Sequence, residues 1–204
     1  MAELLPMFPL NNGLVPGAIL PLHVFEPRYL EMMDRCVEAD GRFGVVLISR
    51  GSEVGGGEQR YDVGTVASIL GAQDLDDGVR LVVGRGERRL RVVEWLEDDP
   101  FPQAMVEELS DGDVPDDPPS RDRLDRAFAR GIGLLSELGV DVGTARELSS
   151  DTNTAIYQAV ALMPIEALDR QLLLETDDGA TRLSTAVEMV EASNELLEAQ
   201  LGSA

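Results

Sequence analysis

The chain has 204 residues, of which 44% are hydrophobic, and 38 acidic against 17 basic side chains give it a net charge of −21. The hydrophobic share is ordinary for a folded globular protein, and the length suits one large domain or two modest ones. So acidic a surface repels phosphate backbones and anionic lipids, because those partners are bound mainly through Lys and Arg. We therefore expect neither nucleic acid nor a membrane as a partner.

Several residue types that catalysis commonly uses are missing or rare. All 17 basic residues are Arg, and the chain has one His, His23, and one Cys, Cys36. Without Lys, a Schiff base, a Ser–Lys dyad and a phosphate loop ending in Lys are excluded. One His and one Cys cannot supply the three or four nitrogen and sulfur ligands of a usual zinc site. The composition predicts a protein that is not an enzyme, with no catalytic residues, no cofactor and no metal site.

Signals for export or membrane insertion are not visible in the sequence. The longest apolar runs, Phe43 to Ile48 and Ala18 to Leu22, are far shorter than the roughly 20 residues that span a bilayer. A secretory signal begins with positive residues, but the first Arg is Arg28. The single Cys36 cannot form an internal disulfide, which suits a reducing compartment. We expect a cytoplasmic protein.

The first hundred residues alternate short apolar runs with turn residues, which is typical of an all-β unit. Asp76–Asp77–Gly78 is a hairpin signal because Gly readily adopts a positive φ, and Gly55–Gly57 indicates a hairpin tip. The predicted strands are Leu4–Leu10, Ala18–Phe25, Phe43–Ser49, Asp62–Ala72, Val79–Val83, Arg88–Leu96 and Gln103–Leu109.

One helix interrupts these strands. Tyr29, Leu30, Met33 and Val37 have helical spacing, and a proline at position 27 suits a first helical turn that ends near Gly41. Seven strands and one helix favour a small closed or half-closed β-barrel over residues 1–110, with the helix covering one end.

The pattern changes after an acidic, proline-rich segment at residues 111–119, which we interpret as a linker. Residues 120–204 have helical periodicity and predict an α-helical subdomain. Four helices are expected: one from Ser120 to Gly139, one capped by Ser150 or Asp151 and broken at Pro164, one over Ile165–Leu174, and one from about Asp178 with heptad-like spacing.

Several fragments occur in an order that resembles a known family. A strand runs directly into a helix at Leu20–Tyr29, and flanking fragments accompany it: Phe8–Leu10, Phe43–Val46, Val63–Val66, Gly86–Val92, Pro102–Glu107, Arg170–Glu175 and Arg182–Leu183. Over nearly the whole chain this order is similar to the amino-terminal, substrate-binding domain of Lon proteases. The resemblance implies an α+β fold, in which a PUA-like β-barrel with one inserted helix precedes an α-helical subdomain. It also implies a stand-alone module, without ATPase or peptidase domains, that recognises polypeptides.

The expected binding residues lie around the first helix. Met32 and Met33 accompany Tyr29 on it, and Phe25 precedes it. Adaptable Met side chains recur at promiscuous binding surfaces, although core filling is their more common use. If one of these methionines is exposed, the helix is the expected edge of a peptide-binding groove. The partners would be unfolded or degron-bearing polypeptides, or one specific protein.

Three other features allow competing interpretations. His23 should face away from Leu22 and Val24, and we expect a structural role for it, because no nucleophile is implied nearby. Arg85, Arg88, Arg89 and Arg91 form a basic cluster that either pairs with surrounding acids or docks an acidic partner. Because PUA-like folds often bind RNA, an RNA-binding protein is the alternative function. The acidic runs Asp74–Asp77 and Asp111–Asp117 do not have the spacing of a calcium loop and are expected to bind a cation at most weakly. A carboxylate-based hydrolase is a second, less favoured alternative function.

Overall fold

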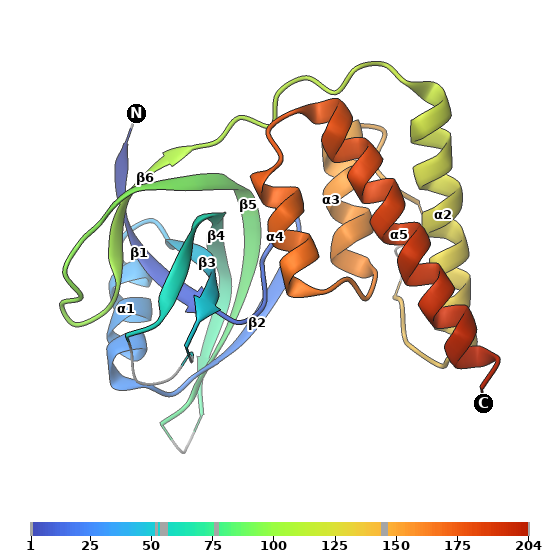
Figure 1. Cartoon of the computed structure of the whole chain (residues 1–204). Coiled ribbons are helices and arrows are strands. Elements are labelled where there is room, and N and C mark those ends of the chain that lie inside the picture. The colour runs from blue at the N-terminus through green and yellow to red at the C-terminus, as the bar shows by residue number, and fades with distance from the viewer. Residues whose placement is uncertain (1, 52, 54–56, 76–77, 144–146, 204) are drawn as a thin grey trace. The chain divides into compact units, whose positions relative to one another are not determined.

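The computed structural model describes residues 2–51, 53, 57–75, 78–143 and 147–203. The chain divides into two compact units, which we call the β unit (Met1–Ser110) and the helical unit (Asp111–Ala204). Figure 1 shows a sheet with one helix in the first and a group of helices in the second. The α+β class predicted from the sequence is confirmed.

The strands and the helix of the β unit follow the predicted order. The elements are β1 (Glu3–Leu10), β2 (Ile19–Val24), α1 (Pro27–Glu38), β3 (Arg42–Arg50), β4 (Gln59–Asp74), β5 (Arg80–Trp95) and β6 (Gln103–Glu108). A proline stands at the first position of α1, and Gly41, just past its end, has a φ of +75° and donates its N–H to the Cys36 carbonyl. These are the start and stop signals that the sequence offered.

Hydrogen bonds close five of these strands into a ring. β1 pairs with β3, β3 with β4, β4 with β5, β5 with β6, and β6 with β1. β2 lies outside the ring and pairs only with the first half of β5. Strands β4 and β5, each of 16 residues, therefore extend beyond the ring, and together with β2 they form a three-stranded wing.

The sequence predicted two strands, Val79–Val83 and Arg88–Leu96, where the structure has the single strand β5; the two-strand prediction was wrong. The intervening Gly84–Arg85–Gly86 does not break the strand, because Gly86 serves close packing rather than a turn. A Cβ at Gly86 would overlap the backbone carbonyl of Val15, and the Gly86 amide donates to the Ala18 carbonyl at 2.9 Å.

Helix α1 covers the inner face of the wing. Its Tyr29, Met32, Met33 and Cys36 belong to one buried cluster with Leu22 and Val24 of β2, Val82 of β5 and Phe8 and Phe43 of the ring. A second cluster, built around Met7, Leu90 and Val106, fills the ring itself. The inner face of the wing is thus buried in the core.

The helical unit contains α2 (Pro118–Glu137), α3 (Thr152–Leu162), α4 (Ala167–Glu175) and α5 (Gly179–Leu201). Asp117, Asp151 and Asp178 cap α2, α3 and α5 by accepting backbone N–H bonds from the residue three positions on. Because α2 begins at Pro118, the segment before it ends two residues earlier than the predicted linker. None of the helices in the described part of the chain is long and apolar enough to cross a membrane.

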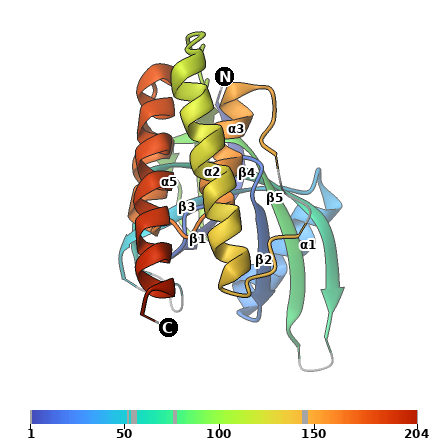
Figure 2. The same cartoon turned by 90° about the vertical axis from the view of Figure 1, so that its right-hand side faces the viewer.

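Helices α2 and α5 run side by side in the same direction (Figure 2). Asn194 lies at a buried heptad position of α5 and donates its Nδ2 to the Ala127 carbonyl of α2 at 2.8 Å. Its oxygen lies against Gly131, where a Cβ would come within 2.6 Å of it and would also overlap Met163. A buried Asn at a heptad position fixes helix register, so this contact sets how α2 and α5 align.

Arg182 of α5 links the first residues of the helical unit to the helices that follow them. The side chain is fully buried, and its Nη1 donates to the Thr176 carbonyl at 2.9 Å. Its Nη2 donates to the Asp111 carbonyl and, at 2.8 Å, to Oδ1 of Asn153 in α3. Each of these acceptors would be left without this donor if the guanidinium were removed.

We predict that Gly64→Ala destabilises the β unit by at least about 2 kcal/mol, because the new Cβ would overlap the Val45 carbonyl oxygen across the β3–β4 pair. Gly71→Ala is the matched control on the same strand, since a Cβ there meets no atom within 4 Å. Urea unfolding of both variants measures the difference. Equal stabilities for the two variants would contradict the close packing described at Gly64.

For the helical unit, Arg182→Met should lower the free energy of unfolding by about 3 kcal/mol, because three partly buried acceptors lose a charged donor. Arg126→Met, on the exposed side of α2 and without a partner in the described ranges, should change it by less than about 0.5 kcal/mol. Urea denaturation followed by far-ultraviolet circular dichroism compares the two. A similar small change in both variants would show that Arg182 does not hold the unit together.

Candidate polypeptide-binding surface

The structure separates the four residues that the sequence singled out for peptide binding. Tyr29 is 3% exposed and Met32 and Met33 are 0% exposed, whereas Phe25 is 56% exposed. A groove edge on this helix was expected only if one of its methionines is exposed, and both are buried. In this conformation only Phe25 can touch a partner, and the expected groove edge on α1 must be corrected.

Tyr29 is held in the core by aromatic stacking and burial. Its ring stacks on Phe8 with 4.3 Å between centroids, and the Arg28 guanidinium lies 4.5 Å from the ring on which it stacks. Burial raises the pKa of the Tyr29 hydroxyl to about 12, with a smaller opposing effect from Arg28. The helical spacing identified in the sequence is the spacing of the core face of α1, not of a binding face.

The opposite, outer face of the wing carries exposed apolar side chains. Directly paired residues share a face, so Ile19, Pro21 and His23 of β2 lie beside Arg85, Val83 and Leu81 of β5. Ile19 is 57% and Val83 40% exposed, Leu81 is half-buried, and Phe25 continues the exposed alternation just past β2. We call this surface the β2–β5 patch; it consists of Ile19, Pro21, His23, Phe25, Leu81, Val83 and Arg85.

Gly71 of β4 leaves a gap in the side chains beside the β2–β5 patch, which we call the notch. Gly71 pairs with Val83 and so belongs to the same face, but it has no side chain, and a Cβ there would meet no atom within 4 Å. Its neighbour Leu70 lies at a register shift of the strand and is exposed. The surface between Val83 and Gly71 therefore has room for a side chain of a partner.

Sequence reasoning missed most of this surface. The alternation that placed His23 opposite Leu22 and Val24 is confirmed, since Leu22 and Val24 are buried and His23 is exposed. The same alternation would have placed Ile19, Pro21 and Phe25 beside His23. The contribution of β5 needed the strand register, which the sequence does not contain.

The basic cluster of the sequence divides in the structure. Arg88 lies within 3.4 Å of the carboxylates of Glu3, Glu87 and Glu108, and buried Arg89 donates to the Ser110 carbonyl at 2.6 Å. Arg85 is exposed and has no partner among the described residues. The cluster is thus mostly paired, and Arg85 is the one member that faces the β2–β5 patch unpaired.

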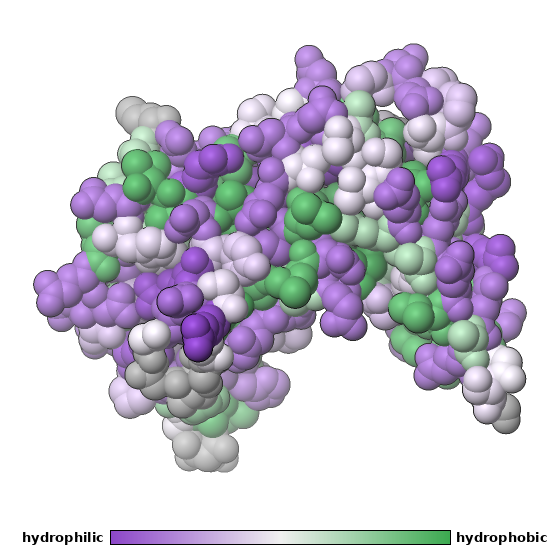
Figure 3. Space-filling view, in the orientation of Figure 1, coloured by the Kyte–Doolittle hydropathy of each residue, from purple (hydrophilic) through white to green (hydrophobic). Residues whose placement is uncertain are grey.

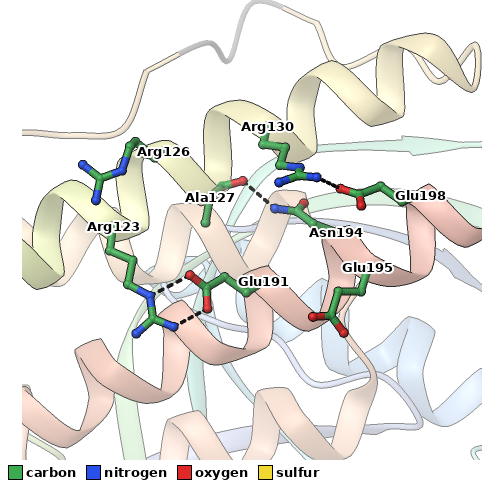
Figure 4. Close-up of a pocket in the computed structure, with 8 residues that line it drawn as sticks. All are labelled: Arg123, Arg126, Ala127, Arg130, Glu191, Asn194, Glu195 and Glu198. Carbon is green, nitrogen blue, oxygen red and sulfur yellow. Dashed lines mark hydrogen bonds and ion pairs between the residues drawn. The ribbon is translucent and has the colours of Figure 1, made fainter.

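A hollow of about 520 Å³ lies between α2 and α5 (Figure 4). Arginines of α2 form one wall and glutamates of α5 the other, and they are bridged: Arg123 Nε donates to Glu191 at 2.7 Å, and Arg130 pairs with Glu198. Because its walls are charged and cross-linked, this hollow is poorly suited to apolar segments.

A smaller hollow, of about 240 Å³, lies beside the end of α1. Arg80 spans it, with Nε 2.5 Å from Asp74 and Nη1 2.5 Å from Asp34. This contact lowers the pKa of the Asp74 carboxyl below its usual range. Asp74, considered above as a cation ligand, is therefore engaged by Arg80, while Asp76 and Asp77 lie outside the described residues.

Neither acidic run forms a metal site in the part of the chain that the structure describes, where no three His, Cys, Asp or Glu side chains converge.

The two predicted hairpin turns are described only in part. Gly78, the described residue of the predicted turn at 76–78, has a φ of +79°. Of the predicted tip at 55–57, only Gly57 is described, also with a φ of +79°.

A second apolar surface lies on the helical unit. Leu168 and Leu172, one turn apart on α4, are both exposed. Figure 3 shows the corresponding apolar surface over α4 near the middle of the view. This surface offers two neighbouring leucines without a notch, so the β2–β5 patch, with five apolar side chains beside an open notch, is the better candidate.

Nearly the whole chain is similar to one protein family. A family model described as the ATP-dependent protease La (LON) substrate-binding domain matches residues 4–192. The Lon protease of Cytophaga hutchinsonii is 27% identical over 204 residues, which cover 96% of this chain and 25% of that protease. Lon protease 2 of Myxococcus xanthus is 26% identical, with 96% and 24% covered. The chain spans about a quarter of the length of these curated relatives.

Solved structures share the fold. A Lon N-terminal domain protein from Xanthomonas campestris superposes with a TM-score of 0.67 at 27% identity, covering 91% of this chain and 98% of that one. The N-terminal domain of a Mycobacterium avium complex Lon protease gives 0.63 at 18% identity, covering 92% and 98%. The second likeness concerns the fold alone.

The burial of α1 can be tested through Cys36. Burial raises the pKa of its thiol to about 12, so the reactive thiolate is suppressed roughly a thousandfold at pH 8 relative to a thiol of pKa about 9. We predict that iodoacetamide labels Cys36 at least about a hundredfold more slowly in the native protein than in urea. Mass spectrometry follows the reaction, and rapid labelling of native protein would show that the inner face of α1 is open.

Proposed function

Because the chain belongs to the family of Lon substrate-binding domains, we propose that it binds exposed apolar segments of polypeptides at the β2–β5 patch and does so without cleaving them. The family assignment supports a substrate-binding module. The location of the site on this chain, its lack of catalysis and its role as an adaptor that holds clients for separate machinery are our proposals.

The observation that carries the location is the exposed apolar face of the wing. Ile19, Phe25 and Val83 remain 57%, 56% and 40% exposed, so covering them would gain roughly half of the about 1.5–3 kcal/mol that full burial of such a side chain gives. Exposed apolar surface of this kind marks interaction sites on soluble proteins. A polypeptide laid across it would cover these side chains and place one of its own beside Gly71.

Charge favours some clients over others. With a net charge of −21, the protein repels strongly acidic chains and attracts basic or neutral ones, mostly within the Debye length of about 8 Å at physiological salt. RNA binding is disfavoured for the same reason. Arg88, which could have contributed to a phosphate-binding patch, is already paired with Glu3, Glu87 and Glu108.

The test is binding of a reduced and alkylated protein that stays unfolded, measured by fluorescence anisotropy with the full chain. Phe25→Ser should raise the Kd about tenfold, because a large aromatic side chain is lost from the contact. Gly71→Glu should weaken binding at least as much, since it fills the notch and adds a charge. Neither change is expected to unfold the protein, because Phe25 is exposed and Gly71 borders open space.

Matched controls remove exposed leucines elsewhere. Leu196→Ser on α5 should leave the Kd within about twofold of the original protein, although Leu196 is also exposed. Loss of binding in a Leu168→Ser, Leu172→Ser double variant, with Phe25→Ser unaffected, would move the site to α4. Recovery of shortened client after incubation would contradict a role without catalysis.

A further inference from the structure

The β2–β5 patch is apolar except at one end. There Arg85 lies directly opposite Ile19 on the outer face, exposed and without a hydrogen-bond or ion-pair partner among the described residues. His23 lies toward the other end, directly opposite Leu81. The patch therefore presents one positive charge beside several apolar side chains, on a protein whose net charge is −21.

Most arginines of the β unit pair with a carboxylate, whereas Arg85 has no such partner among the described residues. Arg28, Arg42, Arg60, Arg80 and Arg88 of the same unit each lie within 4.0 Å of a carboxylate. Acids outnumber arginines by more than two to one, yet no acid among the residues that the structure describes pairs with Arg85. The guanidinium is thus left available for a carboxylate that comes from a partner, with which it can form two parallel hydrogen bonds.

Two requirements then act on the partner together. It must carry one carboxylate next to apolar residues, and it must otherwise carry little negative charge, because the rest of the surface repels anions. Every polypeptide has one carboxylate that is independent of its composition, at its C-terminus. An uncharged apolar tail that ends in its free carboxylate meets both requirements.

We infer that the β2–β5 patch selects the C-terminal ends of polypeptides, with Arg85 binding the terminal carboxylate and Ile19, Val83 and Phe25 contacting the apolar residues that precede it. This inference rests on the proposed function and adds the class of segment that is bound. It makes Arg85 a specificity residue, whereas the apolar side chains provide most of the affinity.

The experiment uses the full chain and three synthetic peptides with the same apolar tail. One ends in a free carboxylate, the second in an amide, and the third in an aspartate whose own C-terminus is amidated. The free acid should bind up to about fivefold more tightly than the amide at low salt, the scale of an exposed ion pair. That preference should disappear in Arg85→Gln, fall with added salt, and persist in Arg50→Gln, which removes an exposed arginine at the end of β3.

Each other outcome overturns a defined part of the idea. Equal binding of acid and amide, with both lost in Phe25→Ser, would refute the role of Arg85 and leave the proposed function intact. Binding of the aspartyl amide as tightly as the free acid would refute selection of C-termini. Failure of all three peptides and of an unfolded protein to bind would instead refute the proposed function.

Discussion

The fold depends on the pairing of β5 with three other strands. One half of this strand closes the ring by pairing with β6, while the other half leaves the ring to pair with β2, and β4 accompanies it along nearly its whole length. The glycine at position 86 lets the backbone near Val15 approach the strand where these two roles meet. The resulting wing has two faces, and α1 covers only the inner one. The outer face is left exposed with its apolar side chains, and the candidate binding surface is a consequence of how the sheet closes.

The same arrangement explains what the sequence could and could not predict. Periodicity, capping residues and turn signals identified the helices and nearly all of the strands, because these are local effects of proline, glycine, aspartate and apolar spacing. The break at Gly84–Gly86 was misread, since a glycine needed for close packing looks the same in a sequence as one needed for a turn. The expectation that residues of α1 face a partner failed for a similar reason: helical spacing shows that Tyr29 and Met33 share a face, but not that this face is buried in the core.

Burial of the apolar face of α1 and exposure of the wing suggest a division of roles within the β unit. The methionines and Tyr29 stabilise the inner cluster, whereas apolar side chains of the outer face remain exposed to solvent. In the helical unit, polar groups carry the corresponding structural roles, because Arg182 and Asn194 donate to backbone carbonyls of other segments of the unit. Membership of the Lon substrate-binding family is the reason for the proposal that the exposed surface binds polypeptides, and with the acidic charge of the chain such a surface would favour basic or neutral ones.

The most direct test of the central claim is to map a bound polypeptide on this 22.1 kDa chain by nuclear magnetic resonance. Backbone amide shifts would be recorded while an unfolded client is titrated into the isotopically labelled protein. The account predicts that the largest shifts lie on the wing, in Ile19–Phe25, Leu70–Gln73 and Leu81–Arg85, with smaller changes along the inner face of α1. Shifts confined to the helical unit, or none at client concentrations that saturate binding, would contradict it.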